Sequence, residues 1–334
     1  MTQRVTLAHN DPIPYDVLVI ATGSRLAPEE TEGLQGQGWG REVFTFYEPT
    51  SATALQRALA AFTKGQIVIN AIDMPIRCPV APIEFTFLAD AYFADQHLRD
   101  DVSINYVTPL DGAFTKPVSS ELLGNMFKER GIELTTNFTT GSVDHDARTI
   151  TSYDGRVVPY ELLVVVPRHN GARYIERSPR VGDELDYVLT DPATLQSATF
   201  PNVFAVGDAT GLPVSKAGSV AHFEASVLVE NIAAFLEDAP LPPRFDGHTN
   251  YFIETGHHKA LLIDFNTAHE PVPGHFPGPI GLPLLKESRL NHLGKLAFEA
   301  LYWHALLPGK DIPHIGSAMP LSGKARNVYD SGSL

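Results

Sequence analysis

The sequence contains little cysteine and little basic charge. Cys78 is the single cysteine among 334 residues, so an internal disulfide and a four-thiolate zinc site are both excluded. The 25 basic side chains stand against 39 acidic ones, and the resulting formal charge of -14 opposes extended contact with a phosphate backbone. We therefore expect no nucleic-acid binding. The 43% of hydrophobic residues is typical of a globular protein with a sizeable core.

Long apolar runs are also missing. The first residues, MTQRVTLAHND, lack the apolar segment of a secretory signal. Nowhere is there an uncharged apolar run of about 18 residues that could span a bilayer. The sequence therefore predicts no signal peptide and no transmembrane helix, and a chain with one cysteine is consistent with the cytosol.

Helical and strand patterns alternate along the chain. Apolar runs predict strands at 17–21, 66–72, 103–107, 133–136, 160–166 and 203–206, and helical patterns cover 51–62, 83–94, 119–130 and 217–236. This alternation predicts an α/β protein with a parallel sheet flanked by helices. The pair Asp154-Gly155 predicts the turn of an antiparallel hairpin. Beyond Ala239, proline- and glycine-rich segments indicate a C-terminal region of different architecture.

The stretch FPNVFAVGDAT at 200–210 runs a buried strand into Gly207 and the carboxylate of Asp208. Ligands collect beyond the carboxyl ends of parallel strands, where glycine lets the backbone approach and helix N-termini supply positive charge. Asp208 could accept hydrogen bonds from ribityl or ribose hydroxyls, or it could cap the next helix. Two features favour ligand binding by Asp208: a helical pattern begins just after Lys216, and a second strand ends in ATG.

YDVLVIATGS and FPNVFAVGDAT, in this order, resemble the second and third flavin-binding motifs of the flavoprotein disulfide reductase superfamily, whose members have two dinucleotide-binding folds. The resemblance implies that the acid of the Gly-Asp pair binds the ribityl chain of FAD. It places the ATG segment near the pyrophosphate and the N-terminus of the later helix near the flavin pyrimidine edge. The implied FAD-binding residues are Thr22, Gly23, Gly207, Asp208, Ala217 and Gly218.

The strand at 66–72 is not followed by the glycine-rich turn that usually binds a nicotinamide cofactor in that superfamily. The segment DMPIRCPVAPIEF follows instead, with prolines in place of glycines and with Asp73 where a pyrophosphate would be repelled. A nicotinamide electron donor is therefore disfavoured. Cys78 lies in this segment before a predicted helix N-terminus, a setting that favours a reactive thiolate. A lone cysteine is otherwise most often a buried small hydrophobe.

CPVAPIEFTFLAD resembles the cysteine-proline segment of sulfide:quinone oxidoreductases and their flavocytochrome relatives, and residues 191–225 resemble the FAD and quinone side of the same family. The resemblance covers most of 16–236 and implies an FAD/NAD(P)-binding, Rossmann-like two-domain fold. It implies that sulfide reduces FAD through a persulfide on Cys78, and that two electrons pass to a membrane quinone. Lys216 would stabilise negative charge on the reduced flavin or quinone, unless it is a solvated surface lysine. We expect His222 and Phe252 to contact the quinone, although Phe252 could equally belong to the core.

Two departures from the family pattern are visible. Many members carry two further redox cysteines, but the corresponding positions here lie near Tyr47 and Thr194, so an external acceptor would have to clear a Cys78 persulfide. The family also begins with a strand, a GxGxxG turn and a helix that bind the ADP half of FAD, a unit of at least ~30 residues. This chain opens a few residues before the ATG motif, which predicts an N-terminally shortened fold. The predicted segments are 1–50, the remainder of the FAD domain; 51–168, a central NAD(P)-binding-like domain without the nicotinamide motif; 169–238, the second part of the FAD domain; and 239–334, a quinone- and membrane-interface region.

Residues 284–307 predict an amphipathic helix with apolar positions 290, 293, 297, 301 and 305 on one face. Tyr302 and Trp303 lie beside that face, and Lys286, Arg289 and Lys295 are available to anionic head groups. This pattern suits a helix at the membrane surface, while a helix packed on its own core would show the same period. We expect a peripheral membrane protein on the cytoplasmic face that could form a homo-oligomer.

The pair His257-His258 suggests a metal site, but adjacent side chains on a strand point to opposite faces, so no metal is predicted. Two other functions remain open. One is an NADH:quinone-type flavin reductase, which the missing nicotinamide glycines disfavour. The other is a catalytically inactive, truncated flavoprotein homologue that acts as a partner or binding module.

Overall fold

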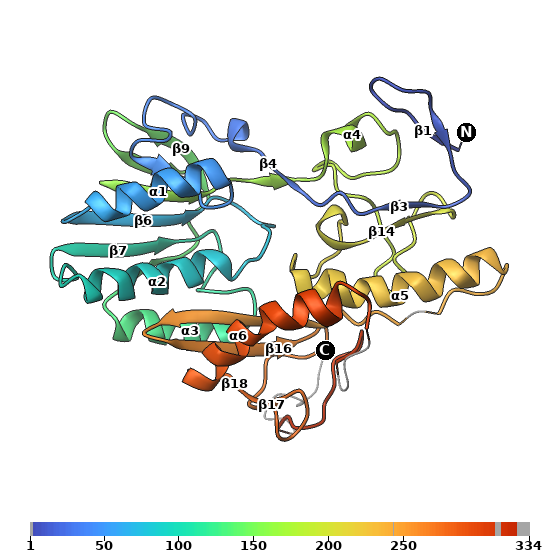
Figure 1. Ribbon diagram of the computed structural model, residues 1–334. Helices are drawn as coiled ribbons and strands as arrows, with labels where there is room; N and C mark the ends of the chain where they lie inside the picture. The colour runs from blue at the N-terminus through green and yellow to red at the C-terminus, as the bar shows by residue number, and fades with distance from the viewer. Residues whose placement is uncertain (1–2, 243, 311–314, 326–334) are drawn as a thin grey trace. The chain divides into compact units, whose positions relative to one another are not determined.

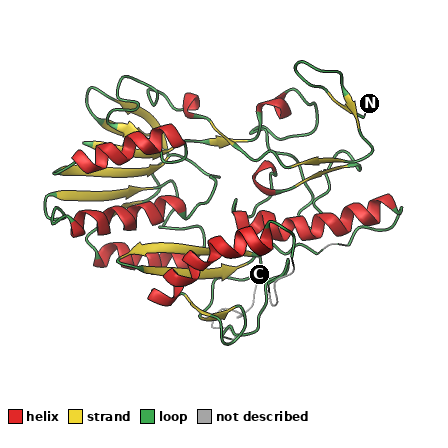
Figure 2. Cartoon of the chain, in the orientation of Figure 1, coloured by secondary structure: helices red, strands yellow, loops and turns green. Residues whose placement is uncertain are grey.

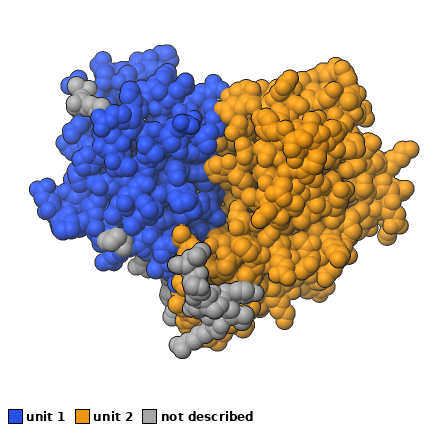
Figure 3. Space-filling model, turned by 180° about the vertical axis from the view of Figure 1, so that it is seen from behind, with its two compact units in different colours: residues 1–25, 170–249, 316–319 blue, residues 26–169, 250–315, 320–334 orange. Residues whose placement is uncertain are grey.

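The computed structural model describes residues 3–242, 244–310 and 315–325 (Figure 1). The chain divides into two compact units, which Figure 3 colours separately. Unit 1 comprises residues 1–25, 170–249 and 316–319, and unit 2 comprises 26–169, 250–315 and 320–334. Most of the predicted C-terminal region thus clusters with the central sheet, and its residues 243, 311–314 and 326–334 lie outside the described residues. The four predicted segments stay a prediction.

Unit 2 is built on a five-stranded sheet in the order β5-β12-β6-β7-β8, with all neighbours parallel. Its strands are β5 (Val43–Phe44), β6 (Gly65–Ala71), β7 (Val102–Val107), β8 (Glu133–Thr135) and β12 (Leu162–Val166). Helices α1 (Pro49–Ala61), α2 (Ala81–Asp95) and α3 (Pro117–Glu129) connect successive strands (Figure 2). The predicted α/β alternation is confirmed. Helices on the faces of a parallel sheet bury its central strands, and all five residues of β12 are buried.

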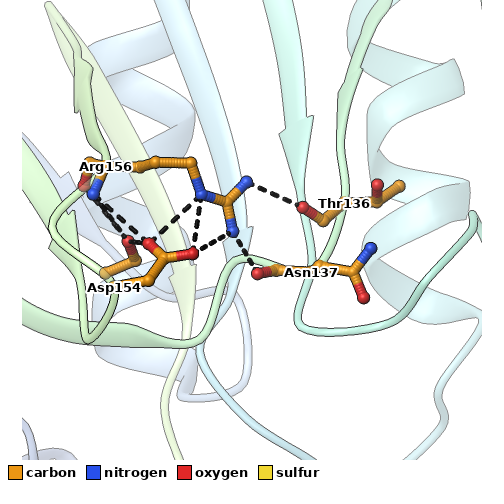
Figure 4. Close-up of polar contacts among 5 residues, drawn as sticks. Thr136, Asn137, Asp154 and Arg156 are labelled. Atoms are coloured by element: carbon orange, nitrogen blue, oxygen red, sulfur yellow. Dashed lines mark hydrogen bonds and ion pairs between the residues drawn. The ribbon is translucent and has the colours of Figure 1, made fainter.

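A three-stranded antiparallel meander follows the sheet in the chain. It consists of β9 (Thr140–Asp144), β10 (Thr149–Ser152) and β11 (Val157–Pro159). The predicted turn at Asp154-Gly155 is confirmed, and Gly155 has a φ of +86°, a conformation that favours glycine. Arg156 pairs with Asp154 and donates to the Thr136 carbonyl at 3.0 Å and to the Asn137 carbonyl (Figure 4). The Ser152 hydroxyl and Arg156 lower the pKa of the Asp154 carboxyl.

Two pairs of strands and a helix complete unit 2. They are β15 (Thr249–Gly256) with β16 (Lys259–Phe265), β17 (Gly274–Phe276) with β18 (Leu282–Leu284), α6 (Arg289–Leu301) and the short π-helical turn η3 (Tyr302–Leu306). His257 and His258 form the turn between β15 and β16, with φ of +51° and +58°, so their predicted strand position is wrong. A two-residue hairpin turn of type I′ requires positive φ at both positions. Across the described ranges, no three His, Cys, Asp or Glu side chains gather into a group that could hold a metal ion.

Unit 1 contains β3 (Leu18–Ile20), which pairs in parallel with β14 (Val203–Ala205), and the long helix α5 (Gly218–Leu236). Its core is formed by Ile20, Ile175, Val188, Val203, Ala205 and Ala209. The smaller elements are β1 (Arg4–Val5), β2 (Ile13–Pro14), α4 (Arg173–Glu176) and the 3-10 turn η2 (Gly207–Ala209). Strand β4 (Arg25–Leu26), which leads to the 3-10 turn η1 (Pro28–Glu30), pairs with β13 (His169–Asn170).

Helix α5 is the one helix in the described part of the chain that could cross a membrane, judged by length and composition alone. A third of its apolar window, 33%, is buried inside the protein, and six of its residues contribute to the interior. The buried residues include Glu224.

Candidate functional site

The carboxyl ends of β3 and β14 lie side by side in unit 1. Ile20 is opposite Ala205, and the Val206 amide donates to the Ile20 carbonyl at 3.0 Å. Each strand leads to a glycine in the left-handed region, Gly23 with a φ of +68° and Gly207 with a φ of +69°. Glycine allows this sharp turn at a sheet edge, where ligands bind in α/β folds. The structure thus brings the two predicted segments together.

Asp208 lies in η2, directly after β14, and is half-buried. Helix α5 begins only at Gly218, and its N-cap residue Ala217 forms no side-chain cap hydrogen bond. Asp208 is therefore not the N-cap residue of α5, and the alternative that its side chain binds the N-terminus of that helix stays a prediction. Asp208 lies on the turn at the edge formed by the two strands.

Lys216 is buried against this turn, with 6% of its surface exposed. Its Nζ donates to the Thr210 carbonyl at 2.7 Å and to the Asp208 carbonyl at 3.4 Å, and it lies 4.0 Å from the centroid of the Tyr187 ring. Burial lowers the pKa of the Lys216 ammonium to about 8, against the opposing effect of nearby carboxylates such as Asp208. A solvated surface lysine is therefore excluded at this position.

Glu224 is the site residue that the sequence reasoning missed. It is fully buried on α5, and its carboxylate accepts the amide proton of Gly207. Burial raises the pKa of the Glu224 carboxyl to about 7, against the opposing effect of the Gly207 hydrogen bond. A signal was present in the sequence: Val220, Phe223 and Val227 have the spacing of one apolar helix face, and Glu224 falls on that face.

The other predicted residues of unit 1 lie after β3 or at the first turns of α5. Thr22 Oγ1 lies 2.9 Å from Tyr174 Oη. A Cβ added at Gly218 would meet no atom within 4 Å, so the first residue of α5 leaves open space. His222 is half-buried one turn into α5, and burial lowers the pKa of its imidazole.

Cys78 lies in unit 2, in the loop between β6 and α2. Its φ of +46° is uncommon for a residue with a side chain, and such conformations concentrate at functional sites. The Cys78 carbonyl accepts the Ala81 amide at 2.8 Å, which joins it to the first turn of α2. Tyr47 follows β5 and donates its hydroxyl to the Arg77 carbonyl at 2.6 Å and to the Cys78 carbonyl at 3.4 Å.

Residues after β12 complete this edge of the sheet. The His169 ring stands edge-on to the Tyr47 ring, with 5.2 Å between the centroids. Arg168 pairs with Asp73 at 3.1 Å. Asp73 therefore does not present the uncompensated negative charge inferred from the sequence. The segment after β6 still contains no glycine turn.

Phe252 is half-buried on β15. It packs against a cluster formed by Leu262, Phe276 and Leu284. The neighbouring Tyr251 points to the opposite side of the strand and is buried beside Phe114 and Phe265. Tyr251 is thus a core residue, and Phe252 contributes to the packing beneath α6.

Helix α6 turns a polar face inward and an apolar face outward. Asn291 is buried and donates to the Pro283 and Lys286 carbonyls, each at 2.9 Å. The exposed apolar side chains of α6 and the turn after it include Leu290, Leu293, Leu296, Trp303 and Leu307. The alternative of a helix whose apolar face packs on its own core is therefore wrong for these residues.

The basic residues near α6 differ in their surroundings. Lys286 and Arg289 are exposed, as predicted for contacts with head groups. Lys295 instead forms an ion pair with Glu84 of α2. Glu84 also accepts the Glu254 amide of β15 at 2.7 Å. The prediction that Lys295 contacts head groups is therefore wrong, because Lys295 joins α6 to α2.

The fold is similar to that of two solved oxidoreductases. The sulfide:quinone oxidoreductase of Aquifex aeolicus superposes with a TM-score of 0.74 and 21% identity, over 92% of this chain and 73% of that one. A ferredoxin reductase of Rhodopseudomonas palustris gives a TM-score of 0.56 and 18% identity, over 82% of this chain and 64% of that one. No protein-family profile matches the chain. The parallel sheet, the glycine turns at the strand ends and these likenesses define a two-domain FAD/NAD(P)-binding flavoprotein fold.

The sequence comparison narrows this class. The chain is similar to mitochondrial sulfide:quinone oxidoreductases of Mus musculus, with 27% identity over 304 residues, and of Dictyostelium discoideum, with 28% identity over 303 residues. Each match covers 89% of this chain. The chain is thus similar to sulfide:quinone oxidoreductases over most of its length. It spans 66% of the length of each of these two relatives.

Proposed function

We propose that this chain takes part in the FAD-dependent oxidation of sulfide, with electron transfer to a membrane quinone. The observation that carries the proposal is the sheet edge of unit 1. There β3 and β14 end side by side, each followed by a left-handed glycine, with Asp208 on the turn and Lys216 buried against it. These residues fit FAD because the glycines admit a close approach and the carboxylate offers acceptors for hydroxyl groups.

The residues of unit 1 have separate tasks in this proposal. Asp208 accepts hydrogen bonds from the ribityl hydroxyls, and Thr22 and Gly23 lie near the pyrophosphate. The N-terminus of α5, at Ala217 and Gly218, provides partial positive charge for the flavin pyrimidine edge. FAD, when bound, accepts two electrons from the sulfur chemistry and delivers them to the quinone. Lys216 stabilises the negative charge that accompanies this reduction.

Cys78 carries the sulfur in unit 2. When its thiolate joins hydrosulfide, one S–S bond forms and one proton and two electrons leave, so the step requires the FAD oxidant named above. Cys78 is the single cysteine of the chain. The outer sulfur of its persulfide must therefore pass to an external nucleophilic acceptor.

The membrane part of the proposal rests on the exposed apolar surface near the C-terminus. The outward leucines of α6 lie at the interface, with Lys286 and Arg289 near anionic head groups. Ile280, in the turn between β17 and β18, is 96% exposed and offers a second apolar contact. His222 of unit 1 and Phe252 of unit 2 are each a predicted quinone contact. The protein is peripheral at the cytoplasmic face and can self-associate.

Purified protein tests the proposal in two measurements: the uptake of FAD, and the sulfide-dependent reduction of a short-chain ubiquinone analogue with sulfite as sulfur acceptor. Asp208→Ala should lose FAD, because the ribityl hydroxyls lose their acceptor. Cys78→Ser should keep FAD and lower sulfide-dependent turnover to the uncatalysed background, because a serine hydroxyl is not ionised as a thiolate is.

Three outcomes would contradict the proposal. Undiminished turnover in Cys78→Ser would remove Cys78 from the sulfur chemistry. Rapid bleaching of the flavin by NADH would support the NADH:quinone-type reductase instead. A protein that takes up no FAD would support the inactive homologue.

A further inference from the structure

The amide of Gly207 points from the turn toward α5 and needs an acceptor there. Gly207 opens η2, and its N–H is the next donor after that of Val206, which bonds the Ile20 carbonyl. Backbone carbonyls inside an α-helix already accept amides of their own helix, and a buried amide without an acceptor is costly. The side chain of Glu224 supplies the acceptor, because its Oε2 binds the Gly207 amide.

The second carboxyl oxygen of Glu224 has no such role. Oε1 is buried and has no hydrogen-bond partner among the residues that the structure describes. The charge of Lys216 favours the ionised carboxylate of Glu224, and the charge of Asp208 opposes it. The charge of Asp183 raises the pKa of Lys216. His222 is a further titratable residue on the same helix as Glu224. Burial is the largest influence and raises the pKa of Glu224 to about 7.

We propose that Glu224 is the positioning residue of the Gly207-Asp208 turn: it holds the Gly207 amide and thereby orients Asp208 toward the ribityl chain of FAD. The inference rests on the proposed FAD site and deepens it, since neither sequence motif contains Glu224. It also predicts a pH effect on FAD binding. Ionisation of Glu224 places a second negative charge beside Asp208, which disfavours an anionic ligand.

The test compares wild type with Glu224→Gln, which keeps an acceptor oxygen, and with Glu224→Leu, which does not. FAD affinity is measured by fluorescence titration at about pH 6 and about pH 7.5, on either side of the carboxyl titration. Hydrogen exchange of the peptide that contains Gly207 is measured by mass spectrometry in FAD-free protein. This second readout reports on the turn without any flavin.

Glu224→Leu should weaken FAD binding by roughly tenfold or more, because one buried hydrogen bond to a charged or polar acceptor is lost. The same variant should speed hydrogen exchange at Gly207. Glu224→Gln should bind FAD within about threefold of wild type at about pH 6 and keep the slow exchange. Its affinity should fall less than that of wild type between the two pH values, because Gln has no proton to lose.

The inference is overturned if Glu224→Leu keeps both the wild-type affinity and the wild-type exchange. It is overturned equally if Glu224→Gln is as impaired as Glu224→Leu, or if it retains the full pH dependence of wild type. Should Glu224→Leu not fold, Glu224→Gln still decides through its pH profile and its exchange. A wild type that takes up no FAD refutes the proposed FAD site, while the exchange comparison still tests how Glu224 holds the turn.

Discussion

Cys78 and Glu224 are both held in states that cost folding free energy. A left-handed φ costs a residue with a Cβ about 1–2 kcal/mol, and Cys78 adopts a φ of +46°. Glu224 loses its solvation, so its carboxyl takes up a proton more readily than in water. Surrounding structure must supply the compensation, and the Tyr47 hydroxyl bonded to the Arg77 and Cys78 carbonyls is one visible part of it.

The strain at Cys78 predicts a stability difference between two variants that both lack the thiol. Cys78→Gly should be more stable than Cys78→Ala by about 1 kcal/mol, because glycine adopts positive φ without a Cβ penalty. Urea unfolding of the two variants measures this difference. Both should lack sulfide oxidation, so the comparison isolates the backbone. Equal midpoints, or a more stable alanine variant, would show that the loop does not hold this residue under strain.

At the scale of elements, α6 has an inner face that is anchored and an outer face that is not covered. Asn291 donates to the carbonyl of Pro283 in β18 and to that of Lys286 in the loop before the helix, and Lys295 pairs with Glu84 of α2. Leu293, between these anchors, and Leu290 and Leu296, which flank them, are exposed. The helix is thus fixed to unit 2 by polar contacts, which leaves its apolar residues available to a membrane surface.

The combined change Leu293→Glu and Leu296→Glu should lower binding to phospholipid vesicles by about tenfold or more. Each leucine loses its transfer free energy, and each glutamate must stay in water. Vesicle co-sedimentation measures the bound fraction. A matched control is the pair Val229→Glu and Leu236→Glu, which adds the same two charges at exposed positions of α5. Equal losses in the control and the α6 variant would contradict a specific role of α6.

At the scale of the whole molecule, two units with separate hydrophobic cores share one chain. Chains with more than one core often unfold in more than one transition. The residues proposed to hold FAD belong to unit 1, whereas Cys78 and α6 belong to unit 2. A ligand that binds only the folded form of one unit stabilises that unit by mass action.

FAD at about 100 times its dissociation constant should raise the unfolding free energy of one transition by about 2.7 kcal/mol and leave the other unchanged. Calorimetry with and without FAD measures both transitions. Asp208→Ala should abolish the shift, and the same excess of NADH should produce none. A shift by NADH instead would indicate a nicotinamide site in the absence of a glycine turn.

The sequence by itself determined the elements and the two strand ends. Buried strands and amphipathic helices carry their periods locally, so the α/β alternation, the Asp154-Gly155 turn and the ATG and Gly-Asp ends were predictable. Only the tertiary structure decided which groups meet: Glu224 with Gly207, Lys295 with Glu84, and Arg168 with Asp73. A hydrogen bond or an ion pair between distant residues depends on how helices and strands pack. That packing leaves no periodic trace in the sequence, apart from an acid on an apolar helix face.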